Sequence, residues 1–154
     1  MTKIYCLVGL GKHSINQIIP AIFNSGGSII STVSSKKGYQ NIKNFKKLSD
    51  AVRELNNEKI IFYLATPYTI HFEQMKEIIS GGFSLFIEKP ALTNSNELKE
   101  ISSISARKQF YAECSMYRYT KMYREFIKIW NEEFSKILSL DINFTVPSLS
   151  LIHI

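Results

Sequence analysis

The chain has 154 residues, of which 45% are hydrophobic, so it is long enough for one ordinary globular domain and too apolar for a disordered polypeptide. No stretch approaches the roughly 18 apolar residues of a membrane span, and the first residues lack the layout of a signal peptide. The sequence therefore predicts a cytoplasmic globular protein that has no membrane partner.

The net charge of +6 comes entirely from the first third of the chain. Residues 1–49 hold seven lysines and no acidic residue, whereas residues 50–154 hold 12 basic residues against 13 acidic ones. A solvated basic face is one interpretation. Nucleic-acid binding is not expected, because a recognisable nucleic-acid motif and interleaved aromatic residues are missing. We favour a small polyanion bound beside the glycine-rich turn described next.

An apolar run at residues 4–8 leads directly into two glycines, Gly9 and Gly11. Such a run is typical of a buried parallel strand. Gly9 permits a sharp turn, and Gly11 lets a pyrophosphate approach the N-terminus of the next helix, where amide groups and the helix dipole favour anions. Ser14 replaces the third glycine of this dinucleotide fingerprint with another small residue. A plain strand-to-helix turn is the alternative interpretation.

The residues after the second expected strand, 28–33, indicate which dinucleotide is expected. A unit that binds NAD places an Asp or Glu about 20 residues beyond the glycines, where it binds the ribose hydroxyls. Here Ser34, Ser35 and Lys36 follow the strand, and no carboxylate occurs before Asp50. Hydroxyl and ammonium groups suit a 2′-phosphate, so we predict NADP as the cofactor, with NAD possible. Exposed polar loop residues are the alternative interpretation.

A short third strand is expected between residues 38 and 47, and the apolar run 59–65 predicts a fourth. The fourth strand ends at Thr66 and Pro67, and a helix follows. His71 lies in the first turn of this helix. We interpret it as a surface or capping residue or, alternatively, as part of the cofactor site.

The next strand, 83–87, leads into Glu88, Lys89 and Pro90. Pro90 restricts the preceding residue to extended backbone, so Lys89 is expected at the carboxyl end of a strand. Ligands bind at that edge of a doubly wound sheet. An ordinary ion pair between Glu88 and Lys89 is one interpretation, and an acid or electrophile at Lys89 is the other.

The alternation of strands and helices predicts an α/β fold with a doubly wound parallel sheet of the Rossmann type. A further helix is expected after residue 94, and a strand at 109–114. Cys6 and Cys114 lie in apolar runs and are expected to be small buried hydrophobic residues. The three scattered histidines do not have the spacing of a metal site, so no metal is expected.

Four segments resemble, in their order, the motifs of the Gfo/Idh/MocA oxidoreductases, and the similarity extends over roughly residues 3–130. They are Gly9-Leu-Gly-Lys-His13, Ala65-Thr-Pro-Tyr-Thr-Ile-His71, Gly81-Gly-Phe-Ser-Leu-Phe-Ile-Glu-Lys-Pro90 and Glu113-Cys-Ser-Met-Tyr-Arg-Tyr119. The Glu-Lys-Pro tripeptide at this interval from Thr-Pro-x-x-x-His is far more specific than the glycine turn. In this resemblance Lys89 is the catalytic lysine, which polarises or protonates the reacting oxygen.

The resemblance also assigns the remaining candidate residues to parts of the cofactor. The pyrophosphate would contact Gly9, Gly11, Lys12 and His13. The adenosine ribose would contact Ser34, Ser35 and Lys36. The nicotinamide side would be lined by Thr66, Pro67, Glu88 and Lys89, with His71 in the same segment as Thr66.

Members of this family carry a second α/β domain on a large, mostly antiparallel sheet that completes the substrate site. The resemblance implies a dinucleotide-binding domain at 1–118 and only the start of the second α/β domain at 119–154. Within that start, the spacing of apolar residues predicts an amphipathic helix at 121–134, and a strand is expected at 137–146. We therefore expect a fragment with exposed apolar surface, inactive alone, and a homo-oligomer in the full-length form.

Two functions are consistent with these residues. The first is the NADP(H)-binding portion of an oxidoreductase that transfers hydride to or from a sugar, cyclitol or nucleotide-sugar substrate. The second is a non-catalytic dinucleotide-binding module with a regulatory or sensing role, because a fold by itself does not determine function.

Overall fold

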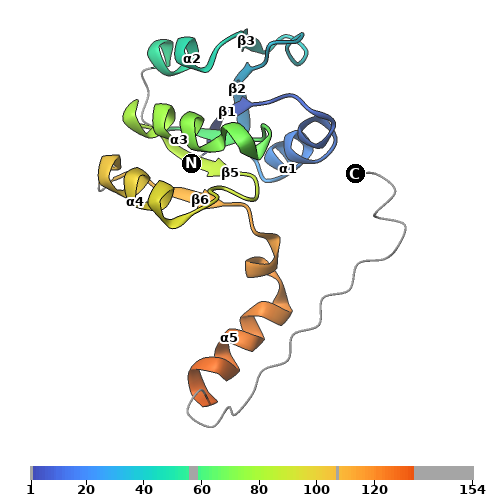
Figure 1. The fold of residues 1–154 in the computed structure, drawn as a ribbon. Helices are drawn as coiled ribbons and strands as arrows, with labels where there is room; N and C mark the ends of the chain where they lie inside the picture. The colour runs from blue at the N-terminus through green and yellow to red at the C-terminus, as the bar shows by residue number, and fades with distance from the viewer. Residues whose placement is uncertain (1, 56–58, 107, 134–154) are drawn as a thin grey trace. The chain divides into compact units, whose positions relative to one another are not determined.

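The computed structural model describes residues 2–55, 59–106 and 108–133. The chain divides into two compact units, Met1–Ser115 and Met116–Ile154. The first unit contains a six-stranded sheet in the order β3-β2-β1-β4-β5-β6, and every pair of neighbouring strands is parallel (Figure 1). The strands are β1 (Ile4–Val8), β2 (Ser28–Val33), β3 (Lys43–Phe45), β4 (Ile60–Leu64), β5 (Ser84–Ile87) and β6 (Tyr111–Glu113).

Helices cover both faces of this sheet (Figure 1). The sheet separates the hydrophobic core into two layers, one on each face. One layer packs α2 (Leu48–Glu54), α3 (His71–Ser80) and α4 (Ser95–Ile104) on the strands. The other packs the π-helical turn η1 (Ser14–Ile18) and α1 (Ile19–Asn24) mainly on β1 and β2. The predicted α/β doubly wound parallel sheet is therefore confirmed.

At β4 and β5 the two faces of the sheet are buried to different extents. In β4, Ile60, Phe62 and Leu64 point into the layer of three helices and are at most 3% exposed. Tyr63 points to the α1 side and is only partly buried, as is Phe86 beside it in β5. These side chains alternate between the two faces because successive residues of a strand point in opposite directions.

The second unit contains a 3-10 turn, η3 (Met116–Tyr119), and the helix α5 (Lys121–Glu133). The helix predicted at 121–134 is therefore present up to residue 133, whereas the strand predicted at 137–146 lies outside the described residues. Met122 and Ile129 are 77% and 56% exposed on α5. Within the described part of the chain, no helix has the length and apolarity that a membrane crossing requires.

Candidate functional site

Four of the predicted segments follow the carboxyl ends of four adjacent strands. Gly9 to His13 follow β1, residues 34–36 follow β2, Thr66 follows β4, and residues 88–89 follow β5. Since these strands are parallel and lie in the order β2-β1-β4-β5, all four segments share one edge of the sheet. Between β1 and β4 the strand order reverses, and this switch point is where doubly wound sheets bind ligands.

Gly9 makes the sharp turn at the end of β1 and packs against the end of β4. Its φ of +94° is a conformation that side chains disfavour, and a Cβ here would lie 2.7 Å from the carbonyl oxygen of Ala65. The N–H of Gly9 donates to the carbonyl oxygen of Val33 at 2.9 Å, and the N–H of Ala65 donates to that of Val8 at 2.8 Å. Only glycine fits this close contact between the ends of three strands.

Gly11 is placed differently, because a Cβ added to it would meet no atom within 4 Å. The residue is exposed, and its carbonyl oxygen accepts a hydrogen bond from Ile15 N–H at 3.1 Å. The structure therefore leaves open space beside the backbone at the second glycine. That space fits the approach of a pyrophosphate, which is the role that the fingerprint gives to this position.

Ser14, in the third position of the fingerprint, is 1% exposed, and its hydroxyl has no hydrogen-bond partner in the described part of the chain. Ser14 is the first residue of a single π turn, which follows the helical residues Lys12 and His13, and the N–H of Ile19 donates to the carbonyl oxygen of Ser14. Such turns are rare and occur frequently at functional sites. Replacing glycine by Ser14 thus places an unpaired polar atom under the start of the helix.

A chain of polar contacts links the glycine turn to the end of β5. The Tyr63 hydroxyl donates to Glu88 Oε1 at 2.8 Å, and His13 Nε2 lies 3.4 Å from the same oxygen. Burial, together with the neighbouring Cys114 and Glu88, raises the pKa of Tyr63, so its O–H remains a donor at neutral pH. Tyr63 was not singled out from the sequence. It is one residue before the end of β4, and its hydroxyl reaches Glu88, which follows the neighbouring strand β5.

The two cysteines differ from each other in burial. Cys6 is fully buried in β1, as predicted, and burial raises its pKa to about 12. Cys114 follows β6 and is only partly buried, beside Tyr63, and burial also raises its pKa. Both thiols are therefore neutral at physiological pH.

His71 is neither a surface residue nor a cap, so that interpretation is wrong. It is the first residue of α3 but is 1% exposed, and no side chain caps this helix. Its Nε2 lies 2.9 Å from the carbonyl oxygen of Thr66, and its Nδ1 lies 2.9 Å from that of Pro90. The side chain thereby connects the segment after β4 to the segment after β5, and any influence on a cofactor would pass through these two loops.

Thr66 has a second contact with the same helix, since its hydroxyl donates to Gln74 Oε1 at 2.6 Å. Pro67 is exposed and precedes the short turn η2 (Tyr68–Ile70). Lys89 is exposed at the end of β5, and the following Lys89–Pro90 peptide bond is cis. The predicted nicotinamide-side residues thus lie on loops that buried contacts hold in place.

The segment after β2 is more exposed. Ser34 is partly buried, whereas Ser35 and Lys36 are exposed. The carbonyl oxygen of Ser34 accepts a hydrogen bond from Asn44 Nδ2 at 3.1 Å, and the N–H of Ser34 donates to the carbonyl oxygen of Phe45. The residues predicted to bind the adenosine ribose are therefore supported from β3, an edge strand that the sequence interpretation did not connect with the site.

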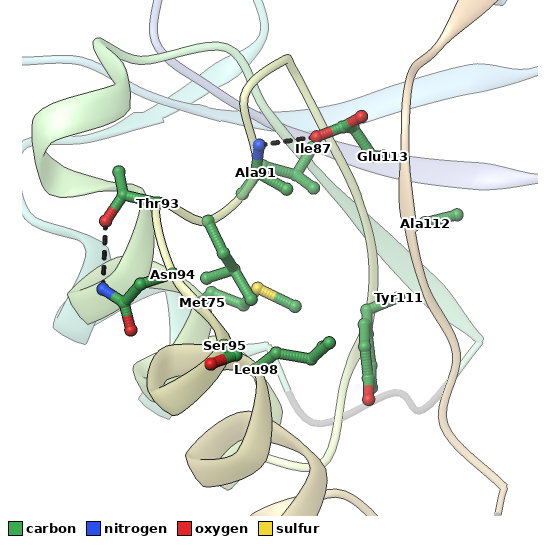
Figure 2. Close-up of a pocket in the computed structure, with 11 residues that line it drawn as sticks. Met75, Ile87, Ala91, Thr93, Asn94, Ser95, Leu98, Tyr111, Ala112 and Glu113 are labelled. Atoms are coloured by element: carbon green, nitrogen blue, oxygen red, sulfur yellow. Dashed lines mark hydrogen bonds between the residues drawn. The ribbon is translucent and has the colours of Figure 1, made fainter.

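A groove of about 520 Å³ lies between β5, β6 and the start of α4 (Figure 2). Apolar side chains form most of its lining, among them Met75, Leu98 and Tyr111. Its carboxylate, on Glu113, accepts a hydrogen bond from the N–H of Ala91 at 2.8 Å. This hydrogen bond holds the main chain at Ala91, the residue directly after the Glu-Lys-Pro segment.

No group of three or more His, Cys, Asp or Glu side chains within residues 2–55, 59–106 and 108–133 has the arrangement of a metal site.

Comparisons with known proteins show the fold of this chain but not its family. No family model and no curated protein sequence matches it. Solved structures do match, at TM-scores of about 0.7 and identities below 20%. They include myo-inositol 2-dehydrogenase from Lactobacillus plantarum (TM-score 0.70, 19% identity, covering 87% of this chain and 42% of that one).

Two further matches were solved with nicotinamide dinucleotides bound. The WlbA dehydrogenase of Chromobacterium violaceum, in complex with NADH and UDP-GlcNAcA, has a TM-score of 0.71 and 18% identity over 86% of this chain and 40% of its own. The 3-ketoreductase KijD10 of Actinomadura kijaniata, in complex with NADP and TDP-benzene, has a TM-score of 0.70 and 12% identity over 86% and 43%.

These structural neighbours are oxidoreductases of the Gfo/Idh/MocA type, so the resemblance found in the sequence is supported at the level of the fold. At such low identities the likeness does not transfer their substrates or residue roles to this chain. The chain spans less than half the length of each neighbour.

Proposed function

We propose that the first unit binds a nicotinamide dinucleotide and that it is the cofactor-binding portion of an oxidoreductase. The observation that carries this proposal is the glycine turn at the switch point of the sheet. Gly9 is fixed by contact with Ala65, and Gly11 faces open space. The pyrophosphate would lie beside Gly11, Lys12 and His13, at the start of η1, where free N–H groups favour an anion.

We propose NADP(H) rather than NAD(H) as the preferred cofactor. The segment after β2 offers the hydroxyls of Ser34 and Ser35 and the ammonium group of Lys36, and the first carboxylate in the sequence is Asp50. A ribose 2′-phosphate would be attracted to these groups, whereas a carboxylate at this point would repel it. The neighbours do not favour either cofactor, because one was solved with NADH and another with NADP.

Lys89 is our proposed catalytic residue. The nicotinamide, when bound, supplies or accepts the hydride, and the chain's own contribution is to hold and polarise the substrate oxygen. Lys89 lies two residues beyond the end of β5, next to Glu88 and on the edge of the sheet shared with the glycine turn. At that place it would donate a proton or a hydrogen bond to the reacting oxygen.

We propose a sugar, cyclitol or nucleotide-sugar alcohol or ketone as the substrate class, with the second unit as the beginning of a substrate domain. The neighbours' printed names support this class, and their greater length supports a substrate site beyond the present 154 residues. Turnover by this chain alone is therefore expected to be weak, and the complete enzyme is expected to be a homo-oligomer.

The proposal is tested by calorimetric titration of the 154-residue chain with NADPH and with NADH. We expect NADPH to bind at least about tenfold more tightly, since a charge-assisted contact to the extra phosphate contributes that much. A Lys89→Ala variant should keep the NADPH affinity within about threefold of that of the wild type. If neither dinucleotide binds the folded chain, the cofactor assignment is wrong.

A further inference from the structure

Within the proposed dinucleotide site, on which this inference rests, we propose that Lys46 is the residue that determines selectivity for a ribose 2′-phosphate. Lys46 follows β3, ten or more positions beyond the segment that would bind the ribose. It belongs to the edge strand, so neither the fingerprint nor the rule for the end of β2 singles it out. Its placement is visible only in the folded chain.

The ammonium group of Lys46 is held against the loop that follows β2. Its Nζ donates to the carbonyl oxygen of Lys36 at 2.7 Å and to that of Ser35 at 3.3 Å. Within the same loop, the N–H of Lys36 donates to the hydroxyl oxygen of Ser34 at 3.2 Å, which stabilises the turn. An ammonium group has three N–H donors, so these two contacts leave one for a ligand.

Asn44 fixes the base of this loop from the same strand. The hydroxyl of Thr32, which is fully buried, donates to Asn44 Oδ1 at 2.9 Å. This bond orients the amide so that its Nδ2 donates to the carbonyl oxygen of Ser34 at 3.1 Å. Gly38 permits the close approach of Asn44, because a Cβ there would lie 2.7 Å from the Cβ of Asn44. The loop after β2 is thus held by Asn44 of β3 and by Lys46, the residue that follows β3.

Lys46 differs in this respect from the other lysines nearby. Lys43 is paired with Glu54 at 2.5 Å, so its charge is already compensated. Lys36 and Lys37 are exposed, as Lys46 is, but within the described residues neither ammonium group makes a hydrogen bond or an ion pair. Ordering a long, exposed side chain on binding costs conformational entropy, whereas a side chain that is already positioned avoids most of that cost. The positioned cation is therefore the more effective phosphate ligand.

The test is the affinity of the 154-residue chain for NADPH and NADH in a Lys46→Met variant. We expect the NADPH affinity to fall about tenfold, while the NADH affinity stays within about twofold, because only NADPH carries the 2′-phosphate. Adenosine 2′,5′-bisphosphate and adenosine 5′-monophosphate should show the same contrast. These smaller probes test the adenosine end without the nicotinamide.

Two control variants separate this role from a general effect of charge or of loop structure. Lys47→Met removes the same charge one residue away, from a side chain that is exposed as that of Lys46 is, and should change the NADPH affinity less than about twofold. Lys46→Arg keeps the cation and should retain most of the selectivity.

A Lys46→Met variant that still prefers NADPH as strongly as the wild type overturns this assignment, as does an equal loss for both dinucleotides. A wild-type chain that binds both dinucleotides without preference overturns the proposed NADP selectivity together with the role of Lys46. The wild-type titration therefore distinguishes failure of the proposed function from failure of this inference.

Discussion

The two ends of the candidate site are held in place by different kinds of contact. At the end predicted to hold the pyrophosphate and the nicotinamide, close packing fixes the main chain of Gly9, and the buried His71 contacts main-chain atoms of Thr66 and Pro90. On the adenosine side, an exposed loop is held by side chains of β3, chiefly Asn44 and Lys46. We therefore expect substitutions at the first end to change stability and substitutions at the second to change ligand selectivity alone.

The largest expected effect separates the two glycines of the turn. Gly9→Ala places a Cβ 2.7 Å from a main-chain oxygen at a positive φ, and it should lower the free energy of unfolding by on the order of 3 kcal/mol. Urea denaturation followed by circular dichroism measures this loss. A Gly9→Ala chain as stable as the wild type would mean that the turn is not packed as described.

Gly11→Ala is the matched control for that substitution. The added methyl group meets no atom within 4 Å, and the φ of Gly11 is not positive, so the free energy of unfolding should stay within about 1 kcal/mol of the wild-type value. The methyl group would instead occupy the space proposed for the pyrophosphate. We expect NADPH binding, measured by calorimetry, to be lost in a folded protein, and unchanged binding would remove the pyrophosphate from this position.

The second prediction concerns the connection between the two nicotinamide-side loops. His71→Leu removes a buried imidazole whose two ring nitrogens face main-chain carbonyl oxygens and which donates to at least one of them, so it should lower the free energy of unfolding by about 3 kcal/mol. His13→Leu is the control, because that side chain is 62% exposed with one long contact, and it should cost less than about 0.5 kcal/mol. Equal losses in the two variants would contradict the distinction between a buried connecting residue and an exposed ligand-side residue.

The third prediction uses pH to probe the strands under the site. Burial raises the pKa of Cys6 to about 12, so above about pH 9 the unfolded chain loses a proton that the folded chain retains. Stability should therefore fall as the pH rises, with Cys6 contributing about 1.4 kcal/mol per pH unit until about pH 12. Urea titrations at several alkaline pH values should show a shallower decline for Cys6→Ala, and parallel declines would contradict this account.

The smallest expected effect tests the departure from the glycine fingerprint. Ser14→Ala removes a buried hydroxyl that has no partner in the described part of the chain, and it should raise the free energy of unfolding by about 1 kcal/mol. Thermal or urea denaturation measures this change. A loss of stability together with weaker NADPH binding would instead indicate that the hydroxyl contacts the ligand.

Much of the fold could be predicted from local patterns. The run 28–33 coincides with β2, and the strands after it were expected close to where β4 and β5 lie. Apolar runs of this length, separated by glycines and helical spacing, leave few alternatives to a doubly wound sheet. Their carboxyl ends also place the candidate residues on one edge, since that consequence needs only parallel strands.

What the sequence could not supply were contacts between residues distant along the chain. His71 looked like a surface residue because its position at the start of a helix carries no sign that two loops close over it. Tyr63 and Lys46 were missed for the same reason, since their partners lie 25 and ten residues away in the sequence. Such pairings depend on strand register and loop path, which local periodicity does not determine.

The most direct measurement is a titration of the 15N-labelled chain with NADPH, followed by two-dimensional NMR of the backbone amides. We expect the largest shifts on Gly9, Gly11 and Lys12 and on residues 34–36, which lie after β1 and β2. Shifts concentrated instead around the groove of Leu92 and Tyr111, with the glycine turn unaffected, would contradict a dinucleotide site at the switch point of the sheet.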